Sequence, residues 1–286
     1  MREIEFFLIG APKTGSYSLW YYLSKHPELC LSIDKEPHIF SREDTVEIDR
    51  LIDEQFKHCK QKQKCVEASL YLQDRGDAER IYNKFPQAKF IVSMRDPIDR
   101  LISNYQYRKS RGDEKRSFEE ILENGEAEDL ITGSLYSKNL KNFIKYFSKS
   151  HFLFVSVENF NLKFEQTLKN IFEFLEVDKN VKIQNEGKLN VTMPKGNFLN
   201  LIFEWNRGSR SWNRPNTSKT RKSILPKNLL NYFSNRGLIK EKSDREHLRE
   251  MIFDKKYSAL VNRFQEDKNE LEKDFNLDLS CWINLN

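Results

Sequence analysis

The sequence predicts an α/β protein in three layers, a central parallel sheet with helices on both faces. Strand-like and helix-like segments alternate along the first 175 residues, the pattern of a sheet built from strand–helix units. The first strand also ends at a glycine-containing turn that leads directly into a helix. A chain of 286 residues can build one large core without a second domain. We therefore expect a single domain over residues 1–286.

Short apolar runs and amphipathic stretches give the expected elements. Strands are expected at Glu5–Ile9, Cys65–Ala68, Phe90–Met94 and Phe152–Val157. Helices are expected at Tyr17–Lys25, Asp77–Lys84, Ile98–Arg108, Ser134–Phe147 and Phe164–Leu175. The pattern then weakens, so residues 197–243 are expected to form a basic lid or insert region. Residues 244–286 form the expected C-terminal helical part, in which Asp244–Phe275 is one long charged helix or a pair.

The turn after the first strand has the features of an anion-binding loop. It runs from Gly10 to Ser16, and the backbone N–H groups and dipole of the following helix favour a bound anion such as phosphate. A kinase-type loop reads G-x-x-x-x-G-K-[ST]. Here Gly10 and Gly15 keep that spacing, but Ser16 follows Gly15 and the lysine lies inside the loop at Lys13.

A second segment adds a cation and a hydroxyl. Residues 89–105 read KFIVSMRDPIDRLISNY, a strand, a break at Asp96-Pro97 and a helix. Arg95 ends the strand and so points to the carboxyl edge of the sheet, where open α/β sheets bind ligands. Ser103 lies two turns into the helix.

Together the two segments resemble the sulfotransferases that use 3′-phosphoadenosine 5′-phosphosulfate (PAPS), in particular bacterial members related to the heparan sulfate and carbohydrate enzymes. The first is similar to their 5′-phosphosulfate loop, and the second to their R-D-P-x-x-R-x-x-S-x-Y segment. The ending Leu277–Trp282 resembles their D-L-S-x-W ending. The resemblance implies a P-loop-like fold and a nucleotide-binding transferase that needs no metal and releases 3′-phosphoadenosine 5′-phosphate (PAP).

The same resemblance implies roles for individual residues. The donor-binding set is Lys13, Thr14, Gly15, Ser16, Tyr17 and Ser18 for the phosphosulfate, with Arg95 and Ser103 for the 3′-phosphate. Lys13 would also stabilise the leaving phosphate. Glu36 lies in Lys35–Phe40, which resembles the E-x-H-F-F stretch of glucosaminyl 3-O-sulfotransferases, and this makes Glu36 the candidate base. His38 is the competing assignment.

Two further segments are assigned by the resemblance. Residues 67–71 look like the E-K-[ST]-P-x-Y segment of the acceptor cleft, although Ala68 replaces its lysine and the proline is missing. Substrate-binding candidates there are Glu67, Ser69 and Tyr71. A basic loop closing over the 3′-phosphate is assigned to Lys195 and Gly196, with Lys219 and Arg221 as the alternative.

The composition leads to expectations about the partners, the redox state and the location of the protein. A net charge of +5 from 48 basic and 43 acidic residues does not by itself imply nucleic acid as a partner. Four cysteines without metal-ligand spacing are expected to be free thiols in a cytoplasmic protein, since no signal peptide or membrane-spanning run is evident. The acceptor is expected to be a carbohydrate or glycolipid hydroxyl, with an amine as the alternative, and the oligomeric state stays open.

Two other functions remain in competition. An ATP-dependent kinase or NTPase could use the same fold, although Ser16 stands where its loop lysine should be. A non-catalytic binder of an anionic polymer could use the basic stretch between Glu204 and Glu241, which contains no acidic residue. Neither motif is needed by such a binder.

Overall fold

The computed structural model describes residues 2–73, 76–124, 128–187 and 244–285 and confirms the α/β class. A five-stranded sheet has the order β2-β3-β1-β4-β5, and every neighbouring pair is parallel. The strands are β1 (Ile4–Gly10), β2 (Leu29–Leu31), β3 (Lys64–Ala68), β4 (Lys89–Met94) and β5 (Phe152–Ser156). Four were predicted, and β2 was missed.

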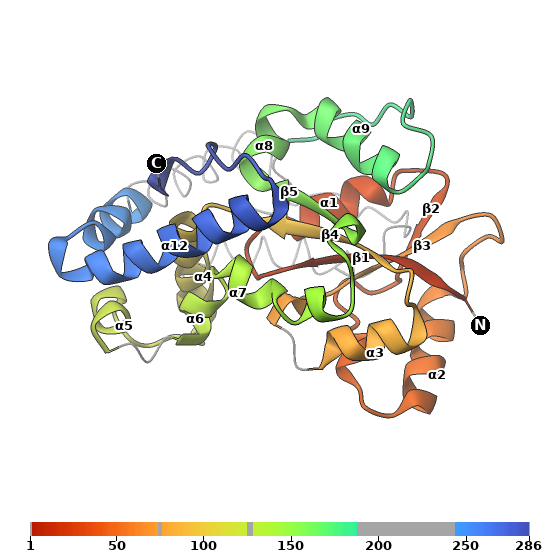
Figure 1. Cartoon of the computed structure of the whole chain (residues 1–286), viewed down its shortest axis with the longest axis horizontal. Helices are drawn as coiled ribbons and strands as arrows, with labels where there is room; N and C mark the ends of the chain where they lie inside the picture. The colour runs from red at the N-terminus through yellow and green to blue at the C-terminus, as the bar shows by residue number, and fades with distance from the viewer. Residues whose placement is uncertain (1, 74–75, 125–127, 188–243, 286) are drawn as a thin grey trace, which may run out of the picture.

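Helices cover both faces of this sheet, as predicted (Figure 1). On one face lie α1 (Ser16–Leu23), α8 (Val157–Leu162) and α9 (Phe164–Phe174). On the other lie α2 (Thr45–Phe56), α3 (Asp77–Lys84) and α7 (Tyr136–Leu140). Further helices are α4 (Pro97–Arg111), α5 (Phe118–Asn124), α6 (Glu128–Thr132) and α12 (Ser258–Phe275).

Alternation along β1 explains why both faces of the sheet are covered. Phe7 and Ile9 belong to the core cluster that includes α2 and α3, whereas Phe6 and Leu8 belong to the cluster that includes α1 and α9. Successive side chains of a strand point to opposite faces, so a strand that is apolar throughout needs a helical layer on each side.

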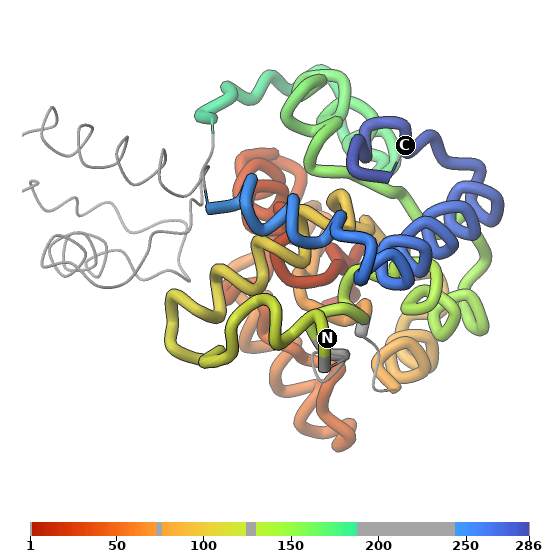
Figure 2. The backbone as a smooth tube through the Cα atoms, turned by 90° about the vertical axis from the view of Figure 1, so that its left-hand side faces the viewer, coloured from red at the N-terminus to blue at the C-terminus, as the bar shows by residue number. Residues whose placement is uncertain are grey.

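A third core cluster joins the C-terminal helical part to the middle of the chain. It combines α4, α5 and α6 with Ile252 and Phe264. Asp99 and Arg249 form a salt bridge of 2.6 Å between the same two regions. Figures 1 and 2 show these segments side by side. One long helix or a pair was expected over Asp244–Phe275, and the structure shows a pair, residues 244–252 and α12.

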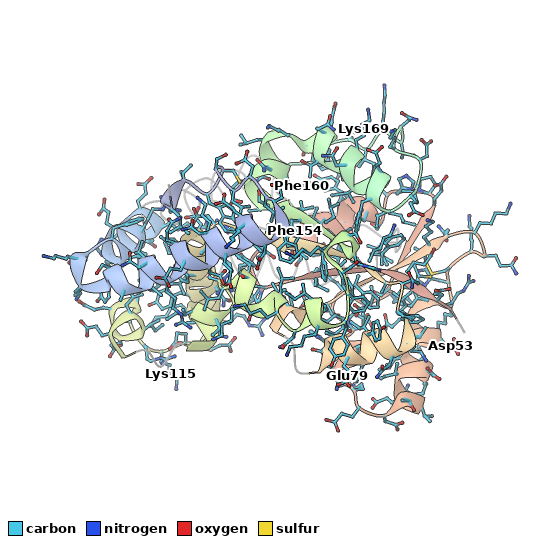
Figure 3. The ribbon with its side chains drawn as sticks, viewed as in Figure 1. Asp53, Glu79, Lys115, Phe154, Phe160 and Lys169 are labelled. Atoms are coloured by element: carbon cyan, nitrogen blue, oxygen red, sulfur yellow. A yellow bond between two sulfur atoms is a disulfide. The ribbon has the colours of Figure 1, made fainter. Side chains whose placement is uncertain are left out.

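Side chains divide between surface and interior as the amphipathic pattern requires. Figure 3 shows Asp53, Glu79 and Lys169 pointing away from the ribbon, and these three side chains are exposed. Phe160, which the same figure labels, is buried in the cluster under α1 and α9. The charged residues therefore lie at solvent-facing positions of helices whose other side closes the core.

Two of the four cysteines are paired, so the prediction of free thiols was wrong for them. Cys30 in β2 forms a disulfide with Cys59, which lies just beyond α2. The spacing of cysteines along the chain does not show this, because the contact depends on where the edge strand β2 lies against α2. Cys65 and Cys281 are free.

Candidate functional site

The anion-binding loop, residues 10–16, lies between β1 and α1 with a strained backbone. Lys13 and Gly15 both have left-handed φ values, +74° and +80°. No side chain caps α1 at Gly15. The Thr14 hydroxyl donates to the Ala11 carbonyl (2.8 Å), so it shapes the loop from inside. The start of α1 is therefore left without a side-chain cap, an arrangement that suits an anion.

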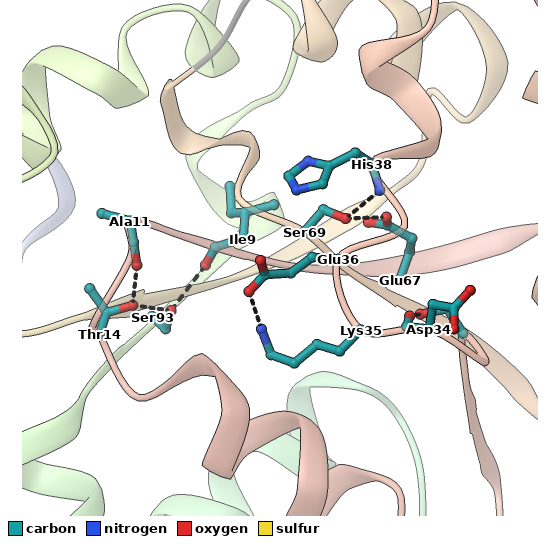
Figure 4. A network of polar contacts seen from close by, with 11 residues as sticks. Ile9, Ala11, Thr14, Asp34, Lys35, Glu36, His38, Glu67, Ser69 and Ser93 are labelled. Carbon is teal, nitrogen blue, oxygen red and sulfur yellow. Dashed lines mark hydrogen bonds and ion pairs between the residues drawn. The ribbon is translucent and has the colours of Figure 1, made fainter. Parts of the chain in front are cut away.

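Two residues without a predicted role hold this loop in place. Ser93 of β4 shares a hydrogen bond of 2.8 Å with Thr14 (Figure 4), and a Cβ at Gly10 would lie 2.2 Å from the Ser93 hydroxyl. Arg100, buried in α4, donates to the Pro12 carbonyl (3.2 Å) and to Ser134 (2.6 Å). The sequence motif contained Arg100 but did not show that it supports the loop from α4.

Arg95 and Ser103 have unused hydrogen-bonding capacity. The Arg95 backbone is fixed by Tyr136, whose hydroxyl accepts from its N–H (3.1 Å) and donates to its carbonyl (2.9 Å). The buried Arg95 Nε has no hydrogen-bond partner, and its guanidinium forms no salt bridge with the described residues. Ser103 is buried, and within the described ranges no side-chain hydrogen bond is formed by its hydroxyl. A cation and a hydroxyl in this state suit a phosphate ligand.

Glu36 and His38 lie in a segment attached to the end of β3. The Glu36 N–H donates to the Ala68 carbonyl (2.8 Å). Its carboxylate, on a side chain 35% exposed, pairs with the Lys35 ammonium (Figure 4). Burial lowers the pKa of His38, so its imidazole is neutral near pH 7.

Glu67, Ser69 and Tyr71 form a buried network behind this segment. One Glu67 oxygen accepts from the hydroxyls of Ser69 (2.6 Å) and Tyr71 (3.0 Å). Burial raises the pKa of Glu67 to about 8 and raises that of Tyr71. Each of the three side chains is internal and hydrogen-bonded to its neighbours. Their role in binding the acceptor stays a prediction.

Lys13 has a contact that the sequence did not predict. Its ammonium lies over the ring of Tyr107 in α4, 4.4 Å from the ring centroid. Such a cation–π contact orients the charge at modest cost. The other basic candidates, Lys195, Gly196, Lys219 and Arg221, lie outside the described residues.

One group of side chains has the chemistry of a metal site, which the sequence did not predict. Ligand atoms of Cys30, His58 and Cys59 lie within 4.8 Å of one another. The two sulfurs are bonded to each other, so neither is a thiolate that could bind a cation.

The site forms because three neighbouring parallel strands end together. Gly10 of β1 is in register with Ser93 of β4, and Leu8 is in register with Ala68 of β3. The loop after β1, Arg95 after β4 and the segment attached to β3 therefore meet at one sheet edge. An anion cradle, cationic groups and a candidate proton acceptor at one edge suit the transfer of a charged group.

Comparisons with known proteins indicate the family of the chain. Residues 3–255 match the family model described as "Sulfotransferase domain". Mouse heparan sulfate glucosamine 3-O-sulfotransferase 3B1 is 28% identical over 175 residues, which cover 59% of this chain and 45% of the mouse enzyme. Mouse carbohydrate sulfotransferase 15 is 24% identical over 243 residues, covering 60% and 43%. The matches thus span less than half of these relatives.

A solved structure supports the fold of the part of the chain described above. The sulfotransferase from Alicyclobacillus acidocaldarius superposes with a TM-score of 0.66 at 22% identity, covering 99% of this chain and 100% of that one. Its sheet-and-helix arrangement is thus shared. Since the family model covers most of the sequence, the chain belongs to the sulfotransferase family.

Proposed function

We propose that this enzyme transfers a sulfuryl group from PAPS to a hydroxyl of a carbohydrate or glycolipid acceptor and releases PAP. The observation that carries the proposal is the meeting of the anion loop, Arg95 and Glu36 at one sheet edge. A donor with phosphates at both ends of its ribose needs two separate anion sites. The uncapped start of α1 suits the 5′-phosphosulfate, and Arg95 with Ser103 suits the 3′-phosphate.

Bond changes in the proposed reaction are few. The acceptor oxygen bonds to sulfur, the bond from sulfur to the bridging phosphate oxygen breaks, and the acceptor proton passes to Glu36. Lys13 would stabilise negative charge on the departing phosphate, the kind of contribution worth roughly 100- to 1000-fold in rate. The Lys35 ammonium pairs with the Glu36 carboxylate and so orients it. His38, with its neutral imidazole, is the second candidate base.

The acceptor class rests on the relatives and on the Glu36 segment. The mouse relatives are named for heparan sulfate glucosamine and for carbohydrate, which supports a sugar hydroxyl. A cytoplasmic location stays a proposal from the sequence. The Cys30–Cys59 disulfide weighs against it, because disulfides are rare in a reducing cytosol. Among the described helices, none combines the length and apolar character needed to cross a bilayer.

Thermal unfolding with added nucleotides tests the donor. We expect PAP to stabilise the protein equally with magnesium or EDTA, by about 2.7 kcal/mol at a hundred times its dissociation constant. Stabilisation by ATP with magnesium, and none by PAP, would replace the sulfotransferase proposal with the kinase interpretation.

Arg95→Ala tests the second anion site. Loss of a charge-assisted hydrogen bond, about 1.5–3 kcal/mol, should weaken PAP binding by roughly ten- to hundredfold and leave ADP binding nearly unchanged. Calorimetric titration of both nucleotides measures this. Arg50→Ala, at an exposed position of α2, is the control and should change neither affinity. Equal losses for PAP and ADP would remove the role given to Arg95.

A further inference from the structure

The segment 36–40, which carries both candidate bases, is held by alternate backbone groups. Each of three N–H groups donates to a group in residues 68–71. The bonds run from Glu36 to the Ala68 carbonyl (2.8 Å), from His38 to the Ser69 hydroxyl (3.0 Å) and from Phe40 to the Tyr71 hydroxyl (3.1 Å). The segment therefore depends on two side-chain hydroxyls as well as on one backbone carbonyl.

Both hydroxyls depend in turn on one carboxyl oxygen. A hydroxyl that accepts a bond from an N–H still has its own proton to donate. Ser69 and Tyr71 both donate to Oε1 of Glu67, and Figure 4 shows Ser69 between Glu67 and the backbone of His38. Glu67 is 0% exposed, so bulk water does not compete with its carboxyl oxygen for the two hydroxyl protons. A single buried atom thus fixes the direction of both hydroxyls.

The held segment needs such support because its backbone is strained. Glu36 and His38 have φ values of +66° and +50°. Residues other than glycine adopt this left-handed conformation at a cost, and it persists where the surroundings determine it. The bonds to residues 68–71 supply those surroundings on one side. On the other side the Phe40 carbonyl accepts from Arg80 (2.6 Å).

We propose that Glu67 is a positioning residue for the transfer reaction. Through Ser69 and Tyr71 it fixes the backbone of residues 36–40, and so the direction of the Glu36 carboxylate and the His38 ring. The catalytic consequence rests on the proposed function, whereas the effect on the segment does not. A raised pKa of about 8 supports the role, since a protonated carboxyl can accept both hydroxyls without a buried charge. The second oxygen, Oε2, is buried without a hydrogen-bond partner.

Two substitutions separate this role from simple packing. Glu67→Gln keeps an oxygen at the position of Oε1 and places the amide nitrogen at Oε2. Glu67→Leu keeps the volume but offers no acceptor. Peptide-level hydrogen exchange over residues 32–44 should be roughly ten- to hundredfold faster in the Leu variant, for the loss of about two hydrogen bonds. In the Gln variant the rate should match the wild type.

The buried Leu168 of α9 supplies the control for a general loss of stability. Leu168→Ala should destabilise the whole protein and leave the ratio of exchange in residues 32–44 to exchange elsewhere unchanged. If the Leu variant of Glu67 shows that same uniform pattern, or if the Gln variant is as fast as the Leu variant, the proposal is overturned.

Steady-state kinetics give the second readout. In Glu67→Leu we expect kcat to fall by about tenfold or more with PAP affinity unchanged, because the anion loop has its own support in Ser93. Glu67→Gln should restore kcat. A wild-type protein that transfers no sulfuryl group would overturn the proposed function but leave the exchange result standing. Loss of PAP affinity in the Leu variant would count against a role limited to residues 36–40.

Discussion

The choice between Glu36 and His38 as base depends on what surrounds each side chain. Glu36 is partly exposed and paired with Lys35, whereas His38 is desolvated and its pKa is lowered. A partly exposed carboxyl group beside the anion loop could take the acceptor proton and pass it to water. We therefore propose Glu36 as the base and a supporting role for His38.

Glu36→Gln tests that assignment. Removal of a general base should lower kcat by roughly 10²- to 10⁴-fold, while PAP affinity stays near the wild-type value. His38→Ala should lower kcat by much less. The measurement is kcat at saturating donor from pH 6 to 9 for both variants. The larger loss in His38→Ala would make the histidine the base.

The sequence could identify some residues of the candidate site and not others. Lys13, Glu36 and Arg95 could be proposed as site residues because each belongs to a local motif whose residue types and spacing suit the chemistry. Ser93 and Tyr136 were not, since their contacts with Thr14 and Arg95 cross between elements far apart in the chain. Nothing in the local spacing indicates those partners.

At the scale of elements, α2, one of the helices that the sequence analysis did not predict, had a visible signal. Ile48, Ile52 and Phe56 repeat every four residues on one face, and Asp44 caps the helix by accepting from the N–H of Val46 (2.9 Å). The strand β2 had none, because three residues are too few for a period to show. The predicted helix Ser134–Phe147 is broken into α7 and the 3₁₀ turn Phe143–Lys145, and its apolar pattern does not distinguish the two.

The N-terminus of α4 connects the donor edge to the end of the chain. One oxygen of Asp96 accepts from the N–H groups of Ile98 (3.0 Å) and Asp99 (3.3 Å). Its other oxygen accepts from the N–H of Asn284 (3.1 Å). The same residue thus starts the helix that carries Ser103 and anchors the C-terminal residues.

Asp96→Ala should therefore lower the free energy of unfolding by more than the loss of an ordinary helix cap does. We expect a loss of about 2 kcal/mol or more of unfolding free energy in urea, against about 1 kcal/mol for a cap alone. Asp44→Ala is the matched control, because the Asp44 cap of α2 is exposed and local. Equal losses in the two variants would show that the bond to Asn284 contributes nothing.

At the scale of the whole molecule, the disulfide joins two elements that also support the site. Cys30 lies in the edge strand β2 and Cys59 just beyond α2. The segment between β2 and Glu36 is tied to α2 as well, because the Asp34 N–H donates to the Gln55 side chain (2.9 Å). Separation of α2 from β2 would therefore disturb the segment that carries the candidate base.

Reduction should lower stability without abolishing the fold. The bridge closes a loop with a sequence separation of 29 residues, for which chain entropy predicts a contribution of about 3–4 kcal/mol. Urea unfolding with and without a phosphine reductant measures it in the wild type and in a double Cys30→Ser, Cys59→Ser variant. The reductant should shift the wild type toward the double variant and leave the double variant itself unchanged. Cys65→Ser, at a buried free thiol, is the control and should keep the full response to reductant. A wild type that does not respond, and whose thiols all react with a labelling reagent after unfolding, would mean that Cys30 and Cys59 are unpaired. The objection to a cytoplasmic location would then disappear with the bridge.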